Sequence, residues 1–193
     1  MVYYRKKLEE DFNERGLGRN MVVKGHRVVL NILSPEDVTQ NYLVWMQDEE
    51  VIQFMECRGE SYTLEELKDY VERMNESHND FLFGVYTKDE NEHIGNIKIG
   101  EINLIHKFGN LGLFIGNKKK WGVGYGAEAV KLATEFAFKE LNLNKLTAGI
   151  YENNIGCYRA FLKAGYNEAG RLKKHRLYKG IYVDQIVVEK CKE

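Results

Sequence analysis

The sequence has few of the residues that build metal centres or disulfide-stapled scaffolds. Its three cysteines, Cys57, Cys157 and Cys191, lie far apart, and no two of them form a Cys-x-x-Cys pair. None of its five histidines lies four residues from another. Structural zinc needs four close Cys or His ligands, and a disulfide scaffold needs several cysteine pairs. We therefore expect neither a metal cofactor nor a disulfide framework.

Long apolar runs and an excess of one charge are missing as well. No segment approaches the roughly 20 apolar residues of a membrane-spanning helix. The first ten residues turn acidic where a signal peptide would be apolar, so we expect a cytoplasmic protein with no membrane partner. Lys and Arg total 28 against 29 Asp and Glu, a net charge of −1. This balance argues against a nucleic-acid partner, which usually needs a basic surface.

The chain does contain enough apolar residues for one core. It is 193 residues long and 44% hydrophobic, which favours a single domain. Residues 1–20 are charged and end in Arg15-Gly-Leu-Gly-Arg19, so we expect an N-terminal arm outside the core, a candidate element for a homodimer. Residues 21–193 are predicted to form the domain.

The order of elements predicts a mixed α/β domain of the α+β kind. A Ser34-Pro35 helix start and a capping box from Thr63 to Glu66 place two helices early, before most of the sheet. Strands are predicted over 26–33, 81–87, 93–103, 110–116, 146–151, 166–177 and 181–190. Two further helices, 127–139 and 154–164, flank the fifth strand. The strand–helix–strand run through 127–139 makes one parallel crossover, so the rest of the sheet is expected to be mostly antiparallel.

A glycine-rich turn joins the strand 110–116 to the helix 127–139. Gly122, Gly124 and Gly126 lack Cβ atoms, so backbone N–H groups there can approach a ligand closely. These donors and the helix N-terminus suit phosphate oxygens, and the lysine run 118–120 would attract a polyanion. The alternative interpretation is a tight turn beside a solvated lysine run.

The spacing of this turn excludes two common phosphate-binding loops. A P-loop ends in Gly-Lys-Ser/Thr, whereas Gly126 is followed by Ala127 and Glu128. A dinucleotide fingerprint is Gly-x-Gly-x-x-Gly at the start of a parallel sheet, whereas this turn is Gly-x-Gly-x-Gly after strands predicted to be antiparallel.

Three motifs in order resemble the GNAT superfamily of acetyl-CoA-dependent N-acetyltransferases, within it the branch of ribosomal-protein N-terminal acetyltransferases. Trp121-Gly-Val-Gly-Tyr-Gly126 is similar to the superfamily's Gln/Arg-x-x-Gly-x-Gly/Ala, with Trp121 in place of the polar first residue. Asn154, followed by Ala160-Phe-Leu-Lys-Ala-Gly-Tyr166, is similar to "Asn … Tyr-Glu-Lys-Leu-Gly-Phe". Gly170-Arg-Leu-Lys-Lys-His and Tyr182-Val-Asp-Gln-Ile-Val-Val complete a likeness that covers about residues 25–190.

The resemblance implies a GNAT-type acyl-CoA N-acyltransferase fold and acetyl-CoA as the acetyl donor. It implies that the pantetheine arm follows the strand edge at Leu113, Phe114 and Ile115, where this strand would separate from 146–151. Asn154 is expected near that arm, or only as the cap of the last helix. The diphosphate is assigned to the turn that consists of Trp121, Gly122, Val123, Gly124, Tyr125, Gly126 and Ala127.

Acetyl transfer needs a base for the amine and, in many relatives, an acid for the leaving thiolate. Relatives carry that acid as a tyrosine seven residues after the asparagine, where this sequence has Phe161. Tyr158, one turn earlier, is the candidate substitute, with a buried structural tyrosine as the alternative. Glu101 is the candidate base and His106 the second candidate, and each has solvent exposure as its alternative.

The acceptor is expected at the early helices and the 103–110 loop. Trp45, Glu56 and His106 are the candidate acceptor-binding residues, with Glu56 as a partner for an amine's charge, unless the aromatic residues only close the core. Two acceptor classes are compatible with these residues: a protein N-terminal α-amine, and a small amine such as a nucleotide-linked amino sugar. Because Phe161 cannot donate a proton, a catalytically silent domain that binds coenzyme A as a sensor or scaffold is the alternative function.

Overall fold

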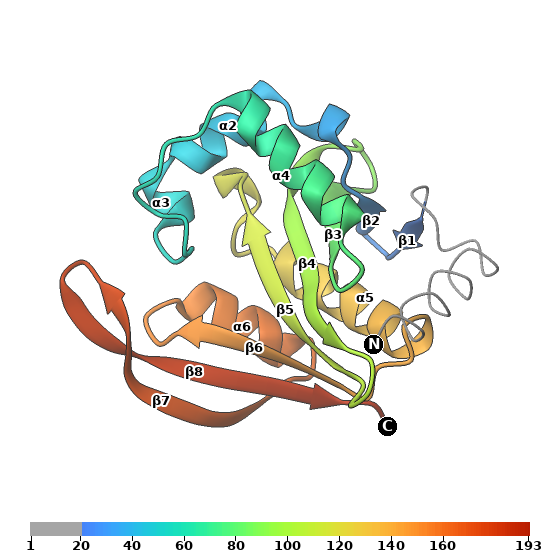
Figure 1. Ribbon diagram of the computed structural model, residues 1–193, viewed down its shortest axis with the longest axis vertical. Coiled ribbons are helices and arrows are strands. Elements are labelled where there is room, and N and C mark those ends of the chain that lie inside the picture. The colour runs from blue at the N-terminus through green and yellow to red at the C-terminus, as the bar shows by residue number, and fades with distance from the viewer. Residues whose placement is uncertain (1–20) are drawn as a thin grey trace.

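The computed structural model describes residues 21–193, which build an eight-stranded sheet with helices on both faces (Figure 1). The strand order is β1-β2-β3-β4-β5-β6-β8-β7. β5 and β6 are parallel, and the other neighbouring pairs among the described strands are antiparallel. The predicted mixed fold around one parallel crossover is therefore confirmed. The predicted arm, residues 1–20, lies outside the described residues.

The elements follow the predicted order closely. The strands are β1 Val22–Lys24, β2 Val28–Ile32, β3 Phe81–Thr87, β4 His93–Asn103, β5 Phe108–Ile115, β6 Lys145–Tyr151, β7 Asn167–Tyr178 and β8 Ile181–Cys191. The helices are η1 Pro35–Asp37, α2 Gln40–Gln47, α3 Glu49–Ile52, α4 Leu64–Glu76, η2 Lys118–Lys120, α5 Tyr125–Lys139 and α6 Ile155–Lys163. Within residues 21–193, no helix is long and apolar enough to cross a membrane.

The early helical region departs most from the prediction. One helix from Ser34 was expected, but the chain forms the short 3-10 helix η1 and starts again at α2. The Asp37 carboxylate accepts hydrogen bonds from the Ser34 backbone and hydroxyl, both at 2.8 Å, which closes η1 locally. Val38 is then drawn into the core and interrupts the helix. The short elements β1 and α3 were not predicted, because three or four residues show no periodicity.

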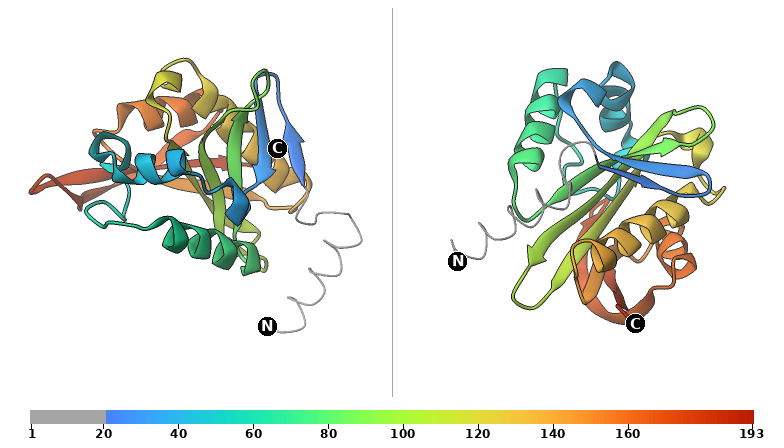
Figure 2. Two further views of the ribbon diagram at one scale, coloured as in Figure 1. Left: turned by 90° about the horizontal axis from the view of Figure 1, so that it is seen from above. Right: turned by 90° about the vertical axis from the view of Figure 1, so that its right-hand side faces the viewer.

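Both faces of the central strands β3 and β4 are buried, and neighbouring residues of these strands pack into different cores. In β3, Phe83 packs into a core with α5 and α6, while Leu82 packs with α2 and α4 on the opposite face. Figure 2 shows α4 and α5 on opposite sides of the strands. The sheet is therefore held from two sides, which fixes the positions of its central strands.

A half-buried histidine, His93 at the start of β4, lies among aromatic rings. The His93 ring stacks on Tyr86 with 4.9 Å between centroids and meets Trp45 edge-on at 5.2 Å. Its Nε2 lies 3.0 Å from the Gly95 carbonyl and 2.8 Å from Asn96 Oδ1. Burial lowers the pKa of His93, and this effect outweighs the hydrogen bonds that favour the charged form. His93 is therefore neutral at pH 7.

This burial predicts a specific loss of stability in mild acid. The unfolded chain takes up a proton on His93 near pH ~6.5, whereas the folded chain stays neutral to lower pH. The free energy of unfolding should fall on this account by up to about 1.4 kcal/mol per pH unit below that value. Denaturant unfolding of the wild type and of His93→Gln, measured from pH 7 to pH 5, should show the stability advantage of the wild type shrinking. A constant difference would contradict the prediction.

Candidate functional site

The parallel strands β5 and β6 pair only at their beginnings. The paired residues are Phe108 with Lys145, Gly109 with Leu146 and Asn110 with Thr147. Beyond them β5 stays paired with β4, and β6 stays paired with β8. The two strands diverge from their shared end near the C-terminus (Figure 1). The expected separation of the strand edge at 113–115 from 146–151 is present.

A cavity of about 1140 Å³ occupies this separation and extends toward the helices on one face. Residues 111–114 of β5 and 148–151 of β6 line its inner part. Its outer part is lined by α4, by segment 54–62, and by Arg176 near the end of β7. The cavity therefore joins the strand edges to a chamber under the early helices. Among residues 21–193, no group of His, Cys, Asp or Glu side chains is placed to hold a metal ion.

The glycine-rich turn lies at the end of β5, where α5 begins. Gly122 and Gly124 have φ of +75° and +99°, a region that favours glycine, and Gly124 is the N-cap of α5. Gly126 lies against Leu113 of β5, since a Cβ there would be 3.1 Å from the leucine side chain. The N–H groups of residues 122–127 have no acceptor among the described residues. They are available to phosphate oxygens.

The lysine run is not the free positive patch that was expected. Lys118 Nζ lies 2.6 Å from Asp48 Oδ2 and also contacts Glu50. Lys120 Nζ lies 2.8 Å from Glu92 Oε2 and also contacts Glu90. These two lysines anchor the turn to the α2–α3 junction and to the β3–β4 hairpin, and their charge is largely matched by carboxylates.

Trp121 supports the end of β5. Its Nε1 donates a hydrogen bond to the Ile115 carbonyl at 2.7 Å, so that carbonyl is already used. Leu113 and Phe114 line the cavity, whereas Ile115 lies outside its wall. The edge that a ligand can reach is therefore shorter than the predicted one.

The start of α6 contributes to the same wall. The Asn154 side chain accepts a hydrogen bond from the Cys157 backbone N–H at 3.2 Å, which makes it the helix cap, and it also lines the cavity. Cys157 lines the cavity too, but burial raises the pKa of its thiol to about 12. A thiol that stays protonated is a poor nucleophile.

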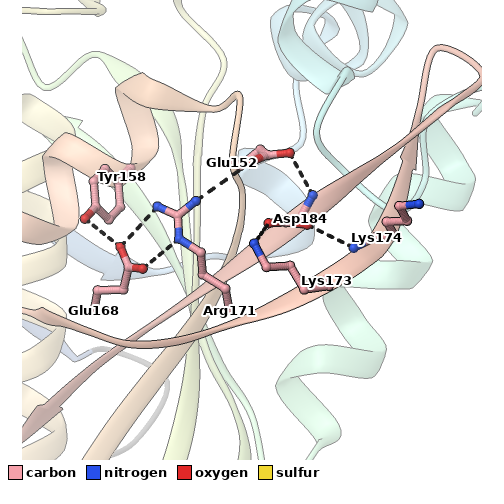
Figure 3. A network of polar contacts seen from close by, with 7 residues as sticks. All are labelled: Glu152, Tyr158, Glu168, Arg171, Lys173, Lys174 and Asp184. Carbon is pink, nitrogen blue, oxygen red and sulfur yellow. Dashed lines mark hydrogen bonds and ion pairs between the residues drawn. The ribbon is translucent and has the colours of Figure 1, made fainter.

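Phe161 and Tyr158 point to different surroundings. Phe161 is 1% exposed, lines the cavity and meets Tyr166 edge-on at 5.0 Å. The Tyr158 hydroxyl donates to Glu168 Oε2 at 3.0 Å, outside the cavity wall and within a network continued by Arg171 (Figure 3). This hydrogen bond raises the pKa of Tyr158. Side chains three positions apart on an α-helix point in directions that differ by about 60°, which is enough to separate Tyr158 from Phe161.

Glu101 and His106 lie at the other end of β4 and β5. Glu101 is exposed, with φ of +53° where the pairing with β5 is irregular. His106 is exposed in the following turn, stacked beside Phe108. Neither lines the cavity. The structure does not bring these two candidate bases to the other predicted site residues.

Of the remaining acceptor candidates, Glu56 lines the cavity and Trp45 does not. Trp45 packs under β5, 6.1 Å from the Phe114 ring and directly against Gly116. Glu56 Oε1 accepts a hydrogen bond from Arg176 Nη1 at 2.6 Å. Trp45 therefore closes the core, and Glu56 belongs to the outer chamber.

The outer chamber is closed on one side by contacts between segment 53–58 and the β7–β8 hairpin. Arg58 donates to the Tyr151 hydroxyl at 2.8 Å and to the Leu177 carbonyl at 2.6 Å. Tyr178 donates to Gln53 Oε1 at 2.7 Å and stacks on Phe54 at 5.1 Å. Sequence reasoning missed these residues, because partners about a hundred positions apart leave no local pattern.

Comparisons with known proteins agree with this arrangement. Residues 27–167 match the model of the acetyltransferase (GNAT) domain family. The chain is 28% identical over 176 residues to the probable N-acetyltransferase YjcK of Bacillus subtilis (strain 168), covering 86% of this chain and 95% of that protein. It is similar in fold to a spermidine N-acetyltransferase from Vibrio cholerae in complex with CoA and spermine (TM-score 0.75, 20% identity, 86% of this chain and 95% of that chain). It is also similar in fold to a ribosomal-protein-S5-alanine acetyltransferase from Vibrio fischeri (TM-score 0.78, 19% identity, 90% of this chain and 98% of that chain).

Proposed function

The chain belongs to the GNAT acetyltransferase family and is an N-acetyltransferase, and we propose that it transfers the acetyl group of acetyl-CoA to a small primary amine. The observation that carries this proposal is the cavity, which runs from the separated edges of β5 and β6 to the chamber under α4. One ligand can enter along the strands while a second enters from the chamber. The two meet where residues 111–114 line the wall.

The donor is proposed to bind at the glycine-rich turn and the β5 edge. The free N–H groups of residues 122–127 hold the diphosphate, where the positive end of the α5 dipole adds attraction. The pantetheine amides pair with the β5 backbone at Leu113, whose N–H and C=O face the open edge, as an added strand would. Asn154 lies on the opposite wall, beside the same arm.

The chemical step is proposed to be direct attack on the thioester. The neutral amine nitrogen forms a bond to the carbonyl carbon and then gives up one proton to solvent. The carbon–sulfur bond breaks, and coenzyme A leaves as the thiolate. A backbone N–H near Phe114 stabilises the oxyanion. Phe161 supplies no proton, and Tyr158 is held by Glu168 outside the cavity. Since a free thiol has a pKa of about 8.5, the thiolate can leave without an acid.

The shape of the outer chamber supports a small acceptor. A protein N-terminus needs a groove that is open at both ends, whereas the contacts of Arg58 and Tyr178 close this chamber on one side. Its wall carries both charges and several hydroxyl and amide groups, including Glu56, Asn96 and Arg176. The two named neighbours, which act on spermidine and on a ribosomal protein, represent the two acceptor classes.

The acceptor proposal is tested with an amine panel. Thioester release from acetyl-CoA should be fast with at least one small primary amine and slow with peptides that present free N-termini of varied sequence. Faster turnover of the peptides would favour a protein acceptor. Tight acetyl-CoA binding without turnover of any amine would favour the catalytically silent domain.

The turn assignment predicts the effect of Gly124→Val. A β-branched side chain at φ +99° is strained, by about 1–2 kcal/mol or more, and its Cβ would lie 2.9 Å from Arg27 Nη2. Calorimetry should show at least a ~10-fold weaker affinity for acetyl-CoA, with no heat for NADH in either protein. The matched control is Gly170→Ala on β7, where an added Cβ meets nothing within 4 Å. Normal acetyl-CoA binding by Gly124→Val would contradict the assignment.

The absence of an acid from the proposed mechanism predicts the pH dependence of turnover. The rate with a saturating small amine should rise as the amine loses its proton and should not fall on the alkaline side up to about pH 9.5. A bell-shaped profile with a fall on the alkaline side would reveal a proton donor and contradict unassisted departure of the thiolate.

A further inference from the structure

Arg27, in the turn between β1 and β2, contacts three consecutive residues of the glycine-rich turn. Its Nη1 donates to the Val123 carbonyl at 3.1 Å. Its Nη2 would lie 2.9 Å from a Cβ at Gly124. Its guanidinium carbon lies 4.9 Å from the centroid of the Tyr125 ring, within the range of a cation–π interaction. A side chain almost a hundred positions away is thus packed onto the turn proposed to hold the diphosphate.

Arg27 is itself held by Glu128, in the first turn of α5. Glu128 Oε1 accepts hydrogen bonds from the backbone N–H groups of Arg27 at 2.7 Å and Val28 at 3.1 Å. Glu128 Oε2 lies 3.4 Å from Arg27 Nε. Burial alone would raise the pKa of Glu128, but these hydrogen bonds outweigh it and hold the pKa below its ordinary value. The β1–β2 turn is therefore fixed to the helix that the glycine-rich turn opens.

The contact with Val123 controls the direction of a backbone donor. In a trans peptide the carbonyl of one residue and the N–H of the next point in opposite directions. With the Val123 carbonyl fixed on Arg27, the Gly124 N–H is directed away from the guanidinium. Gly124, which flanks this peptide on one side at positive φ, would otherwise let it rotate easily. Arg27 removes that freedom before any ligand arrives.

We propose that Arg27 is a positioning residue for the acetyl donor: it holds the peptide between Val123 and Gly124 in the orientation that receives the diphosphate. Preorganised donors bind more tightly than donors that must first be ordered. The paired lysines cannot replace it, because Lys118 and Lys120 contact carboxylates outside the turn. This inference rests on the proposed function, in which the turn is the diphosphate site.

The test compares two acetyl donors in the full-length enzyme. Acetyl-CoA carries the diphosphate, and S-acetylpantetheine has the same thioester without it. Arg27→Gln should raise the KM for acetyl-CoA by about 10-fold or more, the effect of losing a charge-assisted hydrogen bond, with kcat within about twofold. Its kcat/KM with S-acetylpantetheine should equal that of the wild type. Arg27→Lys, which keeps the charge but not the planar fork, should recover only part of the loss.

Lys88→Gln is the matched control. Lys88, in the β3–β4 hairpin, donates from its Nζ to the Gly25 carbonyl at 3.1 Å, so this variant removes one positive charge that contacts the β1–β2 turn without touching the glycine-rich turn. Its KM for acetyl-CoA should stay within about twofold of the wild type. If Arg27→Gln does not fold, Glu128→Gln, which keeps an oxygen for the backbone donors, should show a smaller increase with the same dependence on the donor.

Three results would overturn the proposal. One is an unchanged KM for acetyl-CoA in Arg27→Gln, and another is full recovery in Arg27→Lys. The third is an equal loss of kcat/KM with both donors, which would indicate general damage to the fold. A wild type that uses the two donors equally well would mean that the diphosphate adds no binding energy. In that case the assignment of the turn itself fails, separately from Arg27.

Discussion

The separation of β5 from β6 is the constraint on which the site depends. Backbone N–H and C=O groups in a sheet normally pair with both neighbours, and an unpaired buried group is costly. Here pairing between the two strands stops after Asn110 and Thr147, while β4 and β8 continue to hold their outer edges. The unpaired edges line a cavity instead of a core. A ligand that carries amide groups can complete the pairing that the sheet leaves open.

The sequence predicted the parts of the protein that local patterns encode. The capping box at Thr63, the strands 81–87 and 93–103, and the glycine-rich turn before α5 depend on neighbouring residues, and the structure has them at the predicted places. The separated strand edge was expected from resemblance to a family, not from spacing.

What the sequence did not reveal depends on contacts over long distances. Arg58 meets Leu177, and Glu56 meets Arg176, only after the whole sheet has formed. Glu101 was chosen because it ends a strand, but the end of β4 that faces the cavity is the other one. Tyr158 was chosen by helical spacing, and a rotation of about 60° sends it to Glu168 instead. The sequence pattern alone shows which residues belong to the same helix or strand. It does not show which ends of those helices and strands lie together in the fold.

The contact between segment 53–58 and the β7–β8 hairpin has a consequence for any change to the proposed acceptor chamber. Segment 53–58 precedes β3, and the β7–β8 hairpin lies near the end of the chain. Neither segment therefore belongs to the β5–α5–β6 unit that carries the glycine-rich turn. Under the proposed function, exchange of this pair of segments would change the wall of the proposed acceptor chamber and leave the proposed donor site in place. The exchange has to be made jointly, since Arg58 transplanted without its Leu177 carbonyl would lose the acceptor of its Nη2.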